Sequence, residues 1–555
     1  MIMNFKKIYC QFGSMLFVLL LASCYTISAQ DLIFSRLDSL RGSLSPFRSN
    51  IDVLFYNLDV EVFPQDSIIV GSVEILFEKI TDEKLLQIDA HRNLIIDSIF
   101  WKETPLIFVR ENDVIWITLP EIELQNKSSI IIYYHGKPTI ANNPPWDGGF
   151  VWREDAEGNP WIGVACEGIG ASIWWPNKDH LSDEPDSCTI TCTVPYPLEC
   201  IANGELRQKN TANNKVKSTW HVSYPINNYN ITLNIGKYAH FADTLYRTAD
   251  NSSLKLDFYP LAYNYEKAQH HFGQIKPMLH CLEHYLGYYP FENDGYALVE
   301  TPYLGMEHQG AIAWGNEYKP GYLGRDLSQQ GYTFDYIMLH ETIHEWWGNS
   351  VSCADLADLW IHEAFCTYAE SFYIECLYGY QKAIEYINGS KYRLLNDVPM
   401  RGQYGVNNEG SGDMYVKGAL FLNTLRHVVN KDELWWNMIY GLANDYKFQT
   451  IHADTIIDYF CQKSAMPLRP IFIQYLDFAT VPEFDFYYKN EGKNLVLYYR
   501  WKADVADFSM PFWYKNKAEK DWQILQVNAD WQKINLGKKA IEDDIVFGYN
   551  YFYVK

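Results

Sequence analysis

Hydrophobic and polar residues alternate along the first half of the chain, and this pattern predicts β-strands. From about Asp31 to Asp243, apolar residues recur at every second position in runs that are separated by Asn, Asp, Gly and Pro clusters. Alternation places the apolar side chains on one face, as in a half-buried sheet. The clearest runs are residues 53–63, 67–78, 128–136 and 229–241. We therefore expect an N-terminal β domain over residues 30–245.

Beyond Leu254 the apolar residues recur at three- and four-residue spacing, which predicts helices. Residues 265–287 keep this spacing and end at a glycine shortly before a proline, as helices commonly do. Residues 296–304 then have the pattern of a strand. The helical pattern lasts until a proline-containing stretch near residues 467–482, so we expect a helical domain over residues 246–475.

Short alternating runs return in the last part of the chain and predict a small β-sandwich over residues 476–555. These runs are residues 484–490, 494–501, 508–516, 522–528 and 545–555. They are rich in Trp and Tyr, which carbohydrate-binding surfaces share, but aromatic pairs across neighbouring strands are the commoner cause. The predicted fold class is therefore multidomain α+β.

Residues 1–29 follow the order of a signal peptide. Two lysines at positions 6 and 7 precede an apolar run at residues 15–22 that is too short to span a bilayer. Cleavage after Ala29 suits ordinary signal peptidase, whereas a lipobox that ends at Cys24 would make this cysteine a lipid anchor. We favour ordinary cleavage. We expect an exported protein of the periplasm or cell envelope, with secretion as the alternative, and no transmembrane helix in the mature chain.

Charge and cysteine content exclude two further classes. The chain has 46 Lys+Arg against 68 Asp+Glu, a net charge of −22, and no concentrated basic block, which argues against a nucleic-acid partner. Of its 11 cysteines, two belong to the targeting region and the other nine are scattered without Cys-x-x-Cys spacing, and this odd number argues against a full disulfide framework. Cys188, Cys192 and Cys200 lie in an alternating segment without a histidine. We interpret them as buried strand cysteines, with one disulfide as an option.

A metal-binding pattern occurs in the run HETIHEWWGN. On a helix, His340 and His344 lie four residues apart on one face and can reach the same ion, while Glu341 projects beside them. The later run WIHEAFCTYAE offers Glu363, with eighteen residues between it and the second histidine. Catalytic zinc takes three protein ligands and keeps a fourth position for water. The pattern predicts one zinc ion held by these two histidines and Glu363, with Glu341 as the general base.

An accidental match of ordinary histidines is the alternative, and the flanking sequence argues against it. Thr333 and Asp335 can cap the start of a helix, and apolar residues that include Trp346 and Trp347 give it a body. Gly348 and the asparagine after it then provide a stop.

These motifs resemble the zinc aminopeptidases of the aminopeptidase N and leukotriene hydrolase family, the gluzincin metallopeptidases, and suggest an exported bacterial member. LGMEHQGAIAWGN resembles the family's Gly-x-Met-Glu-Asn motif, and MYVKGALFL resembles the segment of its catalytic tyrosine. CEGIGASIWWPNKDHLSDEPD resembles the segment before the catalytic domain. The order is kept from about residue 50 to 475. The resemblance implies a thermolysin-like, mostly helical zinc domain that hydrolyses peptides at a free N-terminus.

Five further residues receive roles from this resemblance. Tyr415 would donate a hydrogen bond to the oxyanion, and Glu307 would bind the substrate's α-amine. Glu167 stands where the family usually has glutamine and would add a second carboxylate near the amine; a surface glutamate is the alternative. Gly305 and Met306 would line the substrate pocket, with a core methionine as the alternative for Met306.

Two weaker expectations and two alternative functions remain. His308 departs from the family's asparagine, which affects the expected geometry around the amine. Glu370 lies two turns after Glu363 and could orient a zinc-bound imidazole, with a solvated surface glutamate as the alternative. The same zinc site could open an epoxide, as in one branch of the family, or the chain could be a non-catalytic peptide-binding relative.

Overall fold

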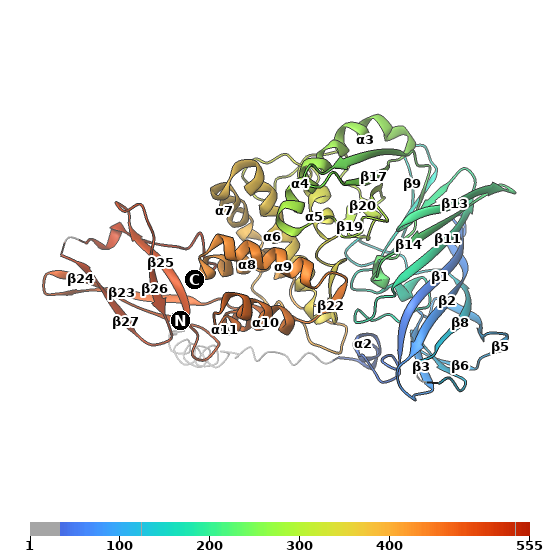
Figure 1. Ribbon diagram of the computed structural model, residues 1–555, viewed down its shortest axis with the longest axis horizontal. Helices are drawn as coiled ribbons and strands as arrows, with labels where there is room; N and C mark the ends of the chain where they lie inside the picture. The colour runs from blue at the N-terminus through green and yellow to red at the C-terminus, as the bar shows by residue number, and fades with distance from the viewer. Residues whose placement is uncertain (1–33, 124, 539) are drawn as a thin grey trace, which may run out of the picture. The chain divides into compact units, whose positions relative to one another are not determined.

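The N-terminal strands form an eight-stranded sheet in the order β13-β14-β11-β1-β2-β8-β4-β5 (Figure 1). β1 pairs parallel with β11 and antiparallel with β2. The computed structural model describes residues 34–123, 125–538 and 540–555. The bounds in this region are α2 Arg36–Gly42, β1 Ile51–Phe63, β2 Ile68–Lys79, β3 Leu85–Asp89, β4 Leu94–Trp101, β5 Thr104–Pro105, β6 Phe108–Glu111, β7 Val114–Thr118, β8 Lys127–Gly136, β9 Gly149–Glu154, β10 Pro160–Ala165, β11 Ser187–Pro195, β12 Glu199–Ile201, β13 Glu205–Ala212, β14 Lys215–Val222 and β15 Asn234–Gly236.

The predicted β-rich start of the chain is confirmed, but the strand predicted over residues 229–241 is largely wrong. Its first residues form a 3-10 turn at Asn228–Asn230, where the Asn227 side chain accepts a hydrogen bond from the Tyr229 backbone N–H. A side chain that binds the backbone in this way competes with strand pairing. Within this stretch, β15 is the one complete strand, and Phe241 begins β16.

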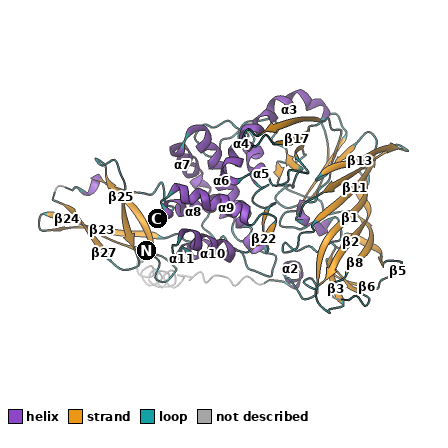
Figure 2. Ribbon diagram, in the orientation of Figure 1, coloured by secondary structure: helices purple, strands orange, loops and turns teal. Residues whose placement is uncertain are grey.

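Helices dominate the middle of the chain, as predicted (Figure 2). The helix expected over residues 265–287 is divided by a 3-10 turn at Phe272–Gln274 into α3 and α4, and α4 ends at Gly287, where φ is +86°. The bounds are β16 Phe241–Tyr246, β17 Ser253–Tyr259, α3 Tyr265–His271, α4 Ile275–Leu286, β18 Tyr296–Glu300, β19 Gly305–Met306, β20 Ile312–Trp314, α5 Tyr336–Ile343, β21 Val351–Cys353, α6 Trp360–Tyr378, α7 Tyr380–Gly389, α8 Val416–Val429, α9 Asp432–Asp445, β22 Gln449–Ile451, α10 Ala453–Ser464 and α11 Arg469–Asp477.

The last part of the chain forms two three-stranded sheets, β23-β24-β27 and β26-β25-β28. Tyr487 of β23 faces Tyr498 of β24, and their rings stack at 4.8 Å, which is the cross-strand pairing expected of this composition. The predicted final strand over residues 545–555 is shorter, because it ends at Phe547. The bounds are β23 Glu483–Glu491, β24 Asn494–Lys502, β25 Met510–Asn516, β26 Gln523–Val527, β27 Gln532–Gly537 and β28 Ile545–Phe547.

Two hydrophobic cores hold these regions. One packs the N-terminal strands and extends to Met306 and Ala313, next to β19 and β20. The other runs from the first strands of the helical region to Tyr553 and includes the C-terminal sheets. Residues Leu37–Lys555 form one compact unit. The boundaries near residues 245 and 475 therefore stay a prediction.

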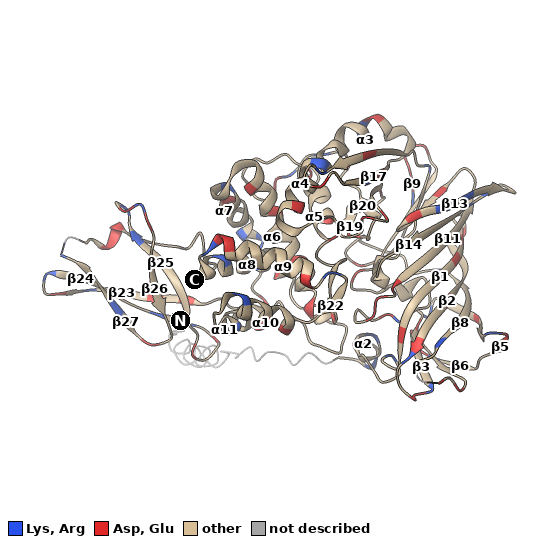
Figure 3. Cartoon of the chain, in the orientation of Figure 1, with Lys and Arg blue, Asp and Glu red and all other residues tan. Residues whose placement is uncertain are grey.

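Several other expectations concern surface and covalent chemistry. Lys and Arg are dispersed among acidic residues along the ribbon (Figure 3). Cys188, Cys192 and Cys200 are buried and free, and the disulfide instead joins Cys281 of α4 to Cys376 of α6. Among the described residues, no helix combines the length and hydrophobicity that crossing a membrane requires. The predicted signal peptide and Cys24 lie outside the described residues.

Candidate metal centre and peptide cleft

Helix α5 brings the two motif histidines together. Asp335 caps it, since its side chain accepts a hydrogen bond from the Met338 backbone N–H at 3.0 Å. The helix ends at Ile343, earlier than the sequence predicted, and His344 is its C-cap. Even so, the Nε2 atoms of His340 and His344 lie 3.2 Å apart, and both rings are buried. α6 adds Glu363, whose Oε2 lies 3.5 and 3.6 Å from these nitrogens.

The hydrogen bonds behind the two imidazoles fix how they face this point. His340 Nδ1 donates to Glu370 Oε1 at 2.8 Å, and His344 Nδ1 donates to the Trp347 carbonyl at 2.9 Å. Because a carboxylate and a backbone carbonyl accept hydrogen bonds, these contacts make each Nδ1 the donor and leave each Nε2 to offer its lone pair to a cation. The structure thus places Glu370 where the sequence suggested, and Tyr386 holds its other oxygen at 2.6 Å.

The donor set fits a zinc ion. Glu363 Oε2 is buried and has no hydrogen-bond partner among the described residues, and it faces the two Nε2 lone pairs. Three lone-pair atoms that converge in a buried place leave each other unsatisfied unless a cation lies between them. Two imidazoles and one carboxylate are a ligand set typical of catalytic zinc. Burial lowers the pKa of His344 to about 4, so this imidazole is neutral near pH 7 and can bind a metal.

All nine site residues that the sequence suggested line one cleft, whose empty volume is about 1220 Å³. They are Glu167, Gly305, Met306, Glu307, His340, Glu341, His344, Glu363 and Tyr415. Met306 is only 4% exposed and also belongs to the N-terminal core. It therefore both lines the pocket and packs in a core, the two roles that the sequence suggested. The cleft therefore joins the metal-binding group to the residues suggested for substrate binding.

Gly305 is required by its distance from the general-base candidate. A Cβ atom at this position would lie 2.5 Å from Glu341 Oε1 and 2.7 Å from the Ile337 side chain. A side chain here would therefore displace the Glu341 carboxylate or the Ile337 side chain, whereas glycine leaves both in place. Burial raises the pKa of Glu341 well above its ordinary value, while nearby His340 lowers it and Glu307 raises it further.

Two further carboxylates line the cleft, Glu167 from the N-terminal region and Glu307 from the helical region. Glu307 follows β19, and its Oε1 accepts a hydrogen bond from the Tyr229 hydroxyl at 3.0 Å. Glu167 lies close to it, with one buried oxygen that has no partner among the described residues. Burial raises the pKa of both carboxyls, and for Glu167 the neighbouring Glu307 raises it further. A cation between them would relieve this repulsion.

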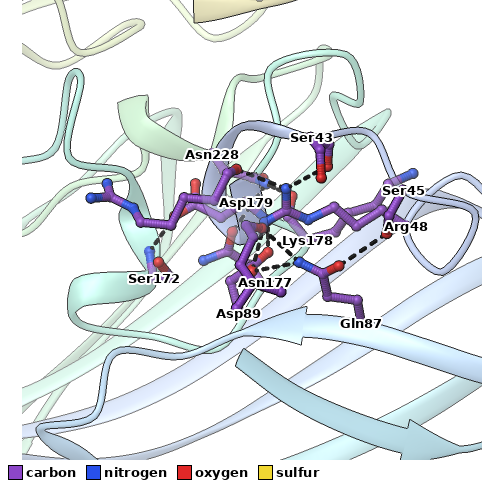
Figure 4. A network of polar contacts seen from close by, with 12 residues as sticks. Ser43, Ser45, Arg48, Gln87, Asp89, Ser172, Asn177, Lys178, Asp179 and Asn228 are labelled. Atoms are coloured by element: carbon purple, nitrogen blue, oxygen red, sulfur yellow. Dashed lines mark hydrogen bonds and ion pairs between the residues drawn. The ribbon is translucent and has the colours of Figure 1, made fainter. Parts of the chain in front are cut away.

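The segment that carries Glu167 is fixed by a buried polar network in the N-terminal region (Figure 4). Arg48 is fully buried and pairs with Asp89 at 2.6 Å. Asp89 in turn accepts from the backbone N–H of Asp179 at 3.1 Å, and Asp179 accepts from the backbone N–H of Ser172 at 2.9 Å. Asp179 therefore ties the loop after Glu167 to the end of β3 and also closes the loop on itself at Ser172.

Tyr415 begins α8 and lies on the other side of the metal-binding group. Its ring lies against that of His340, with 6.2 Å between centroids and 29° between planes. Burial raises the pKa of Tyr415 well above its ordinary value, so the hydroxyl stays protonated and can donate. The nearby carboxylate of Glu363 acts in the same direction.

Sequence reasoning missed several cleft neighbours. His362 lies beside Glu167 and Glu307, with ligand atoms of the three within 4.8 Å. Its Nε2 accepts from the Cys353 backbone N–H at 2.8 Å, so Nδ1 carries the proton and is a donor rather than a metal ligand. Its position immediately before Glu363 in the sequence is a signal that could have identified it. Tyr229 and Arg393 also were not identified, and no motif marks either of them.

His308 is fully buried, and neither ring nitrogen has a hydrogen-bond partner among the described residues. Burial lowers its pKa to about 3, so the imidazole is neutral. It is absent from the residues that line the described cleft. The departure from asparagine thus places a neutral ring behind Glu307.

Comparison with known proteins agrees with this geometry. Residues 271–475 match the family model described as "Peptidase family M1 domain". Human aminopeptidase B is 24% identical over 140 residues, which are 23% of this chain and 22% of that protein. Putative aminopeptidase-2 of Caenorhabditis elegans is 24% identical over 339 residues, 56% of this chain and 17% of that protein. The chain thus matches about a fifth of the length of these curated relatives.

Solved structures share the fold over a longer stretch. The M1 zinc metallopeptidase from Deinococcus radiodurans has a TM-score of 0.66 and 20% identity, and the match covers 78% of this chain and 94% of that one. A mutant of that enzyme bound to a Tyr-Ser-Ala substrate has a TM-score of 0.65 and 19% identity over 80% of this chain and 98% of the other. Residues 271–475 thus match the peptidase family M1 domain, the family that the zinc-site motifs indicated, and the solved M1 metallopeptidases share the fold.

Proposed function

We propose that this chain is a zinc-dependent aminopeptidase that removes single residues from the N-terminus of peptides. The observation that carries the proposal is one cleft that holds a metal-binding group, a neighbouring carboxylate and a separate carboxylate pair. His340, His344 and Glu363 would hold the ion. When bound there, zinc supplies a Lewis acid that polarises the scissile carbonyl and makes water more acidic.

The protein's own groups then carry the protons and the charges. Glu341 lies in the cleft beside His340 and takes a proton from the attacking water. The same carboxyl later gives this proton to the amine that leaves. The Tyr415 hydroxyl donates a hydrogen bond to the oxygen on which negative charge develops. This role needs a neutral phenol, which the raised pKa of Tyr415 ensures.

The carboxylate pair explains why cleavage should occur at a free N-terminus. An ammonium group between Glu307 and Glu167 would form charge-assisted hydrogen bonds and offset the repulsion between the acids. An internal peptide segment has no such charge and would leave both carboxyls buried without a partner. The relatives named aminopeptidase B and aminopeptidase-2 support the same substrate class.

The first experiment compares aminoacyl chromogenic amides with their N-acetylated forms, with and without a chelator. We expect turnover of the free amines only, loss of activity with the chelator, and recovery after zinc is added. Glu341→Gln should keep the metal and lower kcat by about a thousandfold, because general-base catalysis contributes roughly 10²–10⁴.

His344→Ala is the matched control, since it removes a metal ligand and should lower zinc content as well as turnover. Metal analysis separates the two variants. Equal cleavage of free and N-acetylated substrates would contradict the aminopeptidase proposal, and normal turnover of Glu341→Gln would contradict the base.

We also propose that the protein is exported. The disulfide between Cys281 and Cys376 supports this, because such bonds persist mainly in oxidising compartments. The signal-like order of residues 1–29 supports it independently. Mass spectrometry of the mature N-terminus would distinguish cleavage after Ala29 from a lipid-modified Cys24, and an uncleaved N-terminus in the native host would contradict export.

A further inference from the structure

We propose that Arg393 binds the C-terminal carboxylate of short peptides, so that the cleft selects small peptides with both ends free. This inference rests on the proposed aminopeptidase function and names its substrate class. It follows from the distribution of charge within the cleft.

Arg393 is the only lysine or arginine among the described residues that line the cleft. The acids there are Glu167, Glu307, Glu341, Glu363 and Glu409. Arg393 is exposed, and within the described part of the chain its guanidinium makes no hydrogen bond or ion pair. Arginines on protein surfaces commonly find a carboxylate, so an unpaired one at the edge of an acidic cleft is available to a ligand.

The position of Arg393 separates it from the carboxylate pair. It ends the 3-10 helix Ser390–Arg393 that follows α7, whereas Glu167 and Glu307 lie at the wall formed with the N-terminal region. Arg393 and Tyr336 line the cleft together and also line a smaller neighbouring pocket, and Tyr336 stacks on His340 at 5.7 Å. Arg393 thus enters the cleft on the side of the aromatic ring that packs against a metal-binding histidine.

Tyr322 is a second aromatic residue of the cleft near Arg393. Burial raises the pKa of its phenol, Arg393 lowers it, and Glu341 raises it further, so Tyr322 lies within reach of both charges. The leaving amine, which takes its proton from Glu341, belongs to the part of the substrate that continues to its C-terminus. Tyr322, Glu341 and Arg393 all line the cleft, so this part of the substrate can pass the guanidinium.

A short peptide matches this arrangement at both ends. Its ammonium group would bind at Glu167 and Glu307, and its carboxylate would meet the planar guanidinium, which accepts this group in a two-point geometry. A long peptide would carry its carboxylate past Arg393. A C-terminal amide would lose the charge and leave Arg393 unpaired.

The test uses a peptide series on the full-length zinc-loaded protein. The N-terminal residue is the best one from the chromogenic panel, followed by one to five alanines, and each peptide is made as a free acid and as a C-terminal amide. We expect kcat/KM of the acid to exceed that of its amide by about tenfold at the shortest lengths, mainly through KM, because the contact is an exposed charge pair made equally in both states.

Arg393→Met should bring the ratio of acid to amide close to one at every length, and Arg393→Lys should restore part of it because the charge returns without the fork. The ratio cancels any general effect of the substitution on the cleft. Lys382→Gln, on the exposed side of α7, is the control that removes one positive charge elsewhere and should keep the wild-type ratio.

Three results would overturn the inference. They are a wild-type ratio near one at all lengths, a ratio that survives in Arg393→Met, and an equal loss for acids and amides in that variant. The last result would mean that Arg393 only offsets the carboxylates of the cleft. Cleavage of N-acetylated peptides would instead contradict the aminopeptidase function, so the two failures are distinguishable.

Discussion

The hydroxyl group of Tyr415 gives this residue a proposed catalytic role in addition to the packing of its ring. The ring contacts His340, and the hydroxyl is the donor that the proposed mechanism needs. Tyr415→Phe keeps the ring and removes the donor. We expect kcat to fall by about a hundredfold or more with little change in KM, since removing one oxyanion donor commonly costs 10²–10³.

The control for this prediction is the melting temperature with zinc bound, which should stay within about a degree because a half-buried hydroxyl contributes little to folding. Activity within threefold of the wild type would assign the oxyanion to another residue.

Individual residues of the site differ in how well the sequence predicts them. His340, His344 and Glu363 are marked by spacing, because a metal requires several ligands on regular elements. Tyr229 and Arg393 are marked by nothing, since each enters the cleft through a turn whose position depends on the rest of the fold. Whether the motif residues perform their suggested roles stays a prediction until the variants are measured.

At the scale of elements, Asp335 stabilises the start of α5 both as its N-cap and through contacts with two other elements. Besides the Met338 N–H, Asp335 accepts from the Trp314 indole at 3.0 Å and contacts His271 at 2.6 Å. Trp314 and His271 belong to β20 and α3, two elements outside the metal-binding helix. The cap therefore fixes α5 to β20 and α3 at once.

Asp335→Ala should lower the free energy of unfolding by about 2–4 kcal/mol, the sum of a lost N-cap and a buried indole N–H without a partner. Thermal unfolding of the metal-free protein would measure it as a lower melting temperature. Asp335→Asn keeps a capping oxygen and should lose less. An unchanged melting temperature in Asp335→Ala would show that α5 is fixed by its packing alone.

The elements that the sequence predicted wrongly share a cause. The helical pattern continues through Trp346 and Trp347, but the chain leaves the helix after Ile343 and turns at Gly348, where φ is +116°. Both tryptophans are nevertheless buried, because the turn also faces the core. Periodicity reports burial, and a buried turn can imitate the period of a helix.

At the scale of the whole molecule, the helical region and the C-terminal sheets share one core. Phe552 is 1% exposed and lies against Phe512, Trp513 and His427, so it joins β25 to α8. The backbone of Tyr553 binds Thr424 of α8 at 2.9 Å. The sequence predicted the order of the β, helical and β regions correctly, but apolar residues alone could not predict that two of them share a core.

Phe552→Ala should lower the free energy of unfolding by about 3–5 kcal/mol, as large cavities in cores commonly do. Below the melting temperature, kcat and KM should be close to those of the wild type, because Phe552 is not among the residues that line the described cleft. Trp531→Ala is the control, since that ring is 44% exposed and its loss leaves no closed cavity. Equal melting temperatures for the two variants would contradict a shared core.

The buried network of Arg48, Asp89 and Asp179 has a consequence for how this enzyme could acquire new specificities. This network attaches the loop that follows Glu167 to the sheet region rather than to the zinc-binding helices. One of the two carboxylates proposed to select the substrate's N-terminus thus comes from a different part of the polypeptide than the zinc ligands do. Recombination or drift in the sheet region can alter which chain ends are accepted while the hydrolytic machinery is passed on intact.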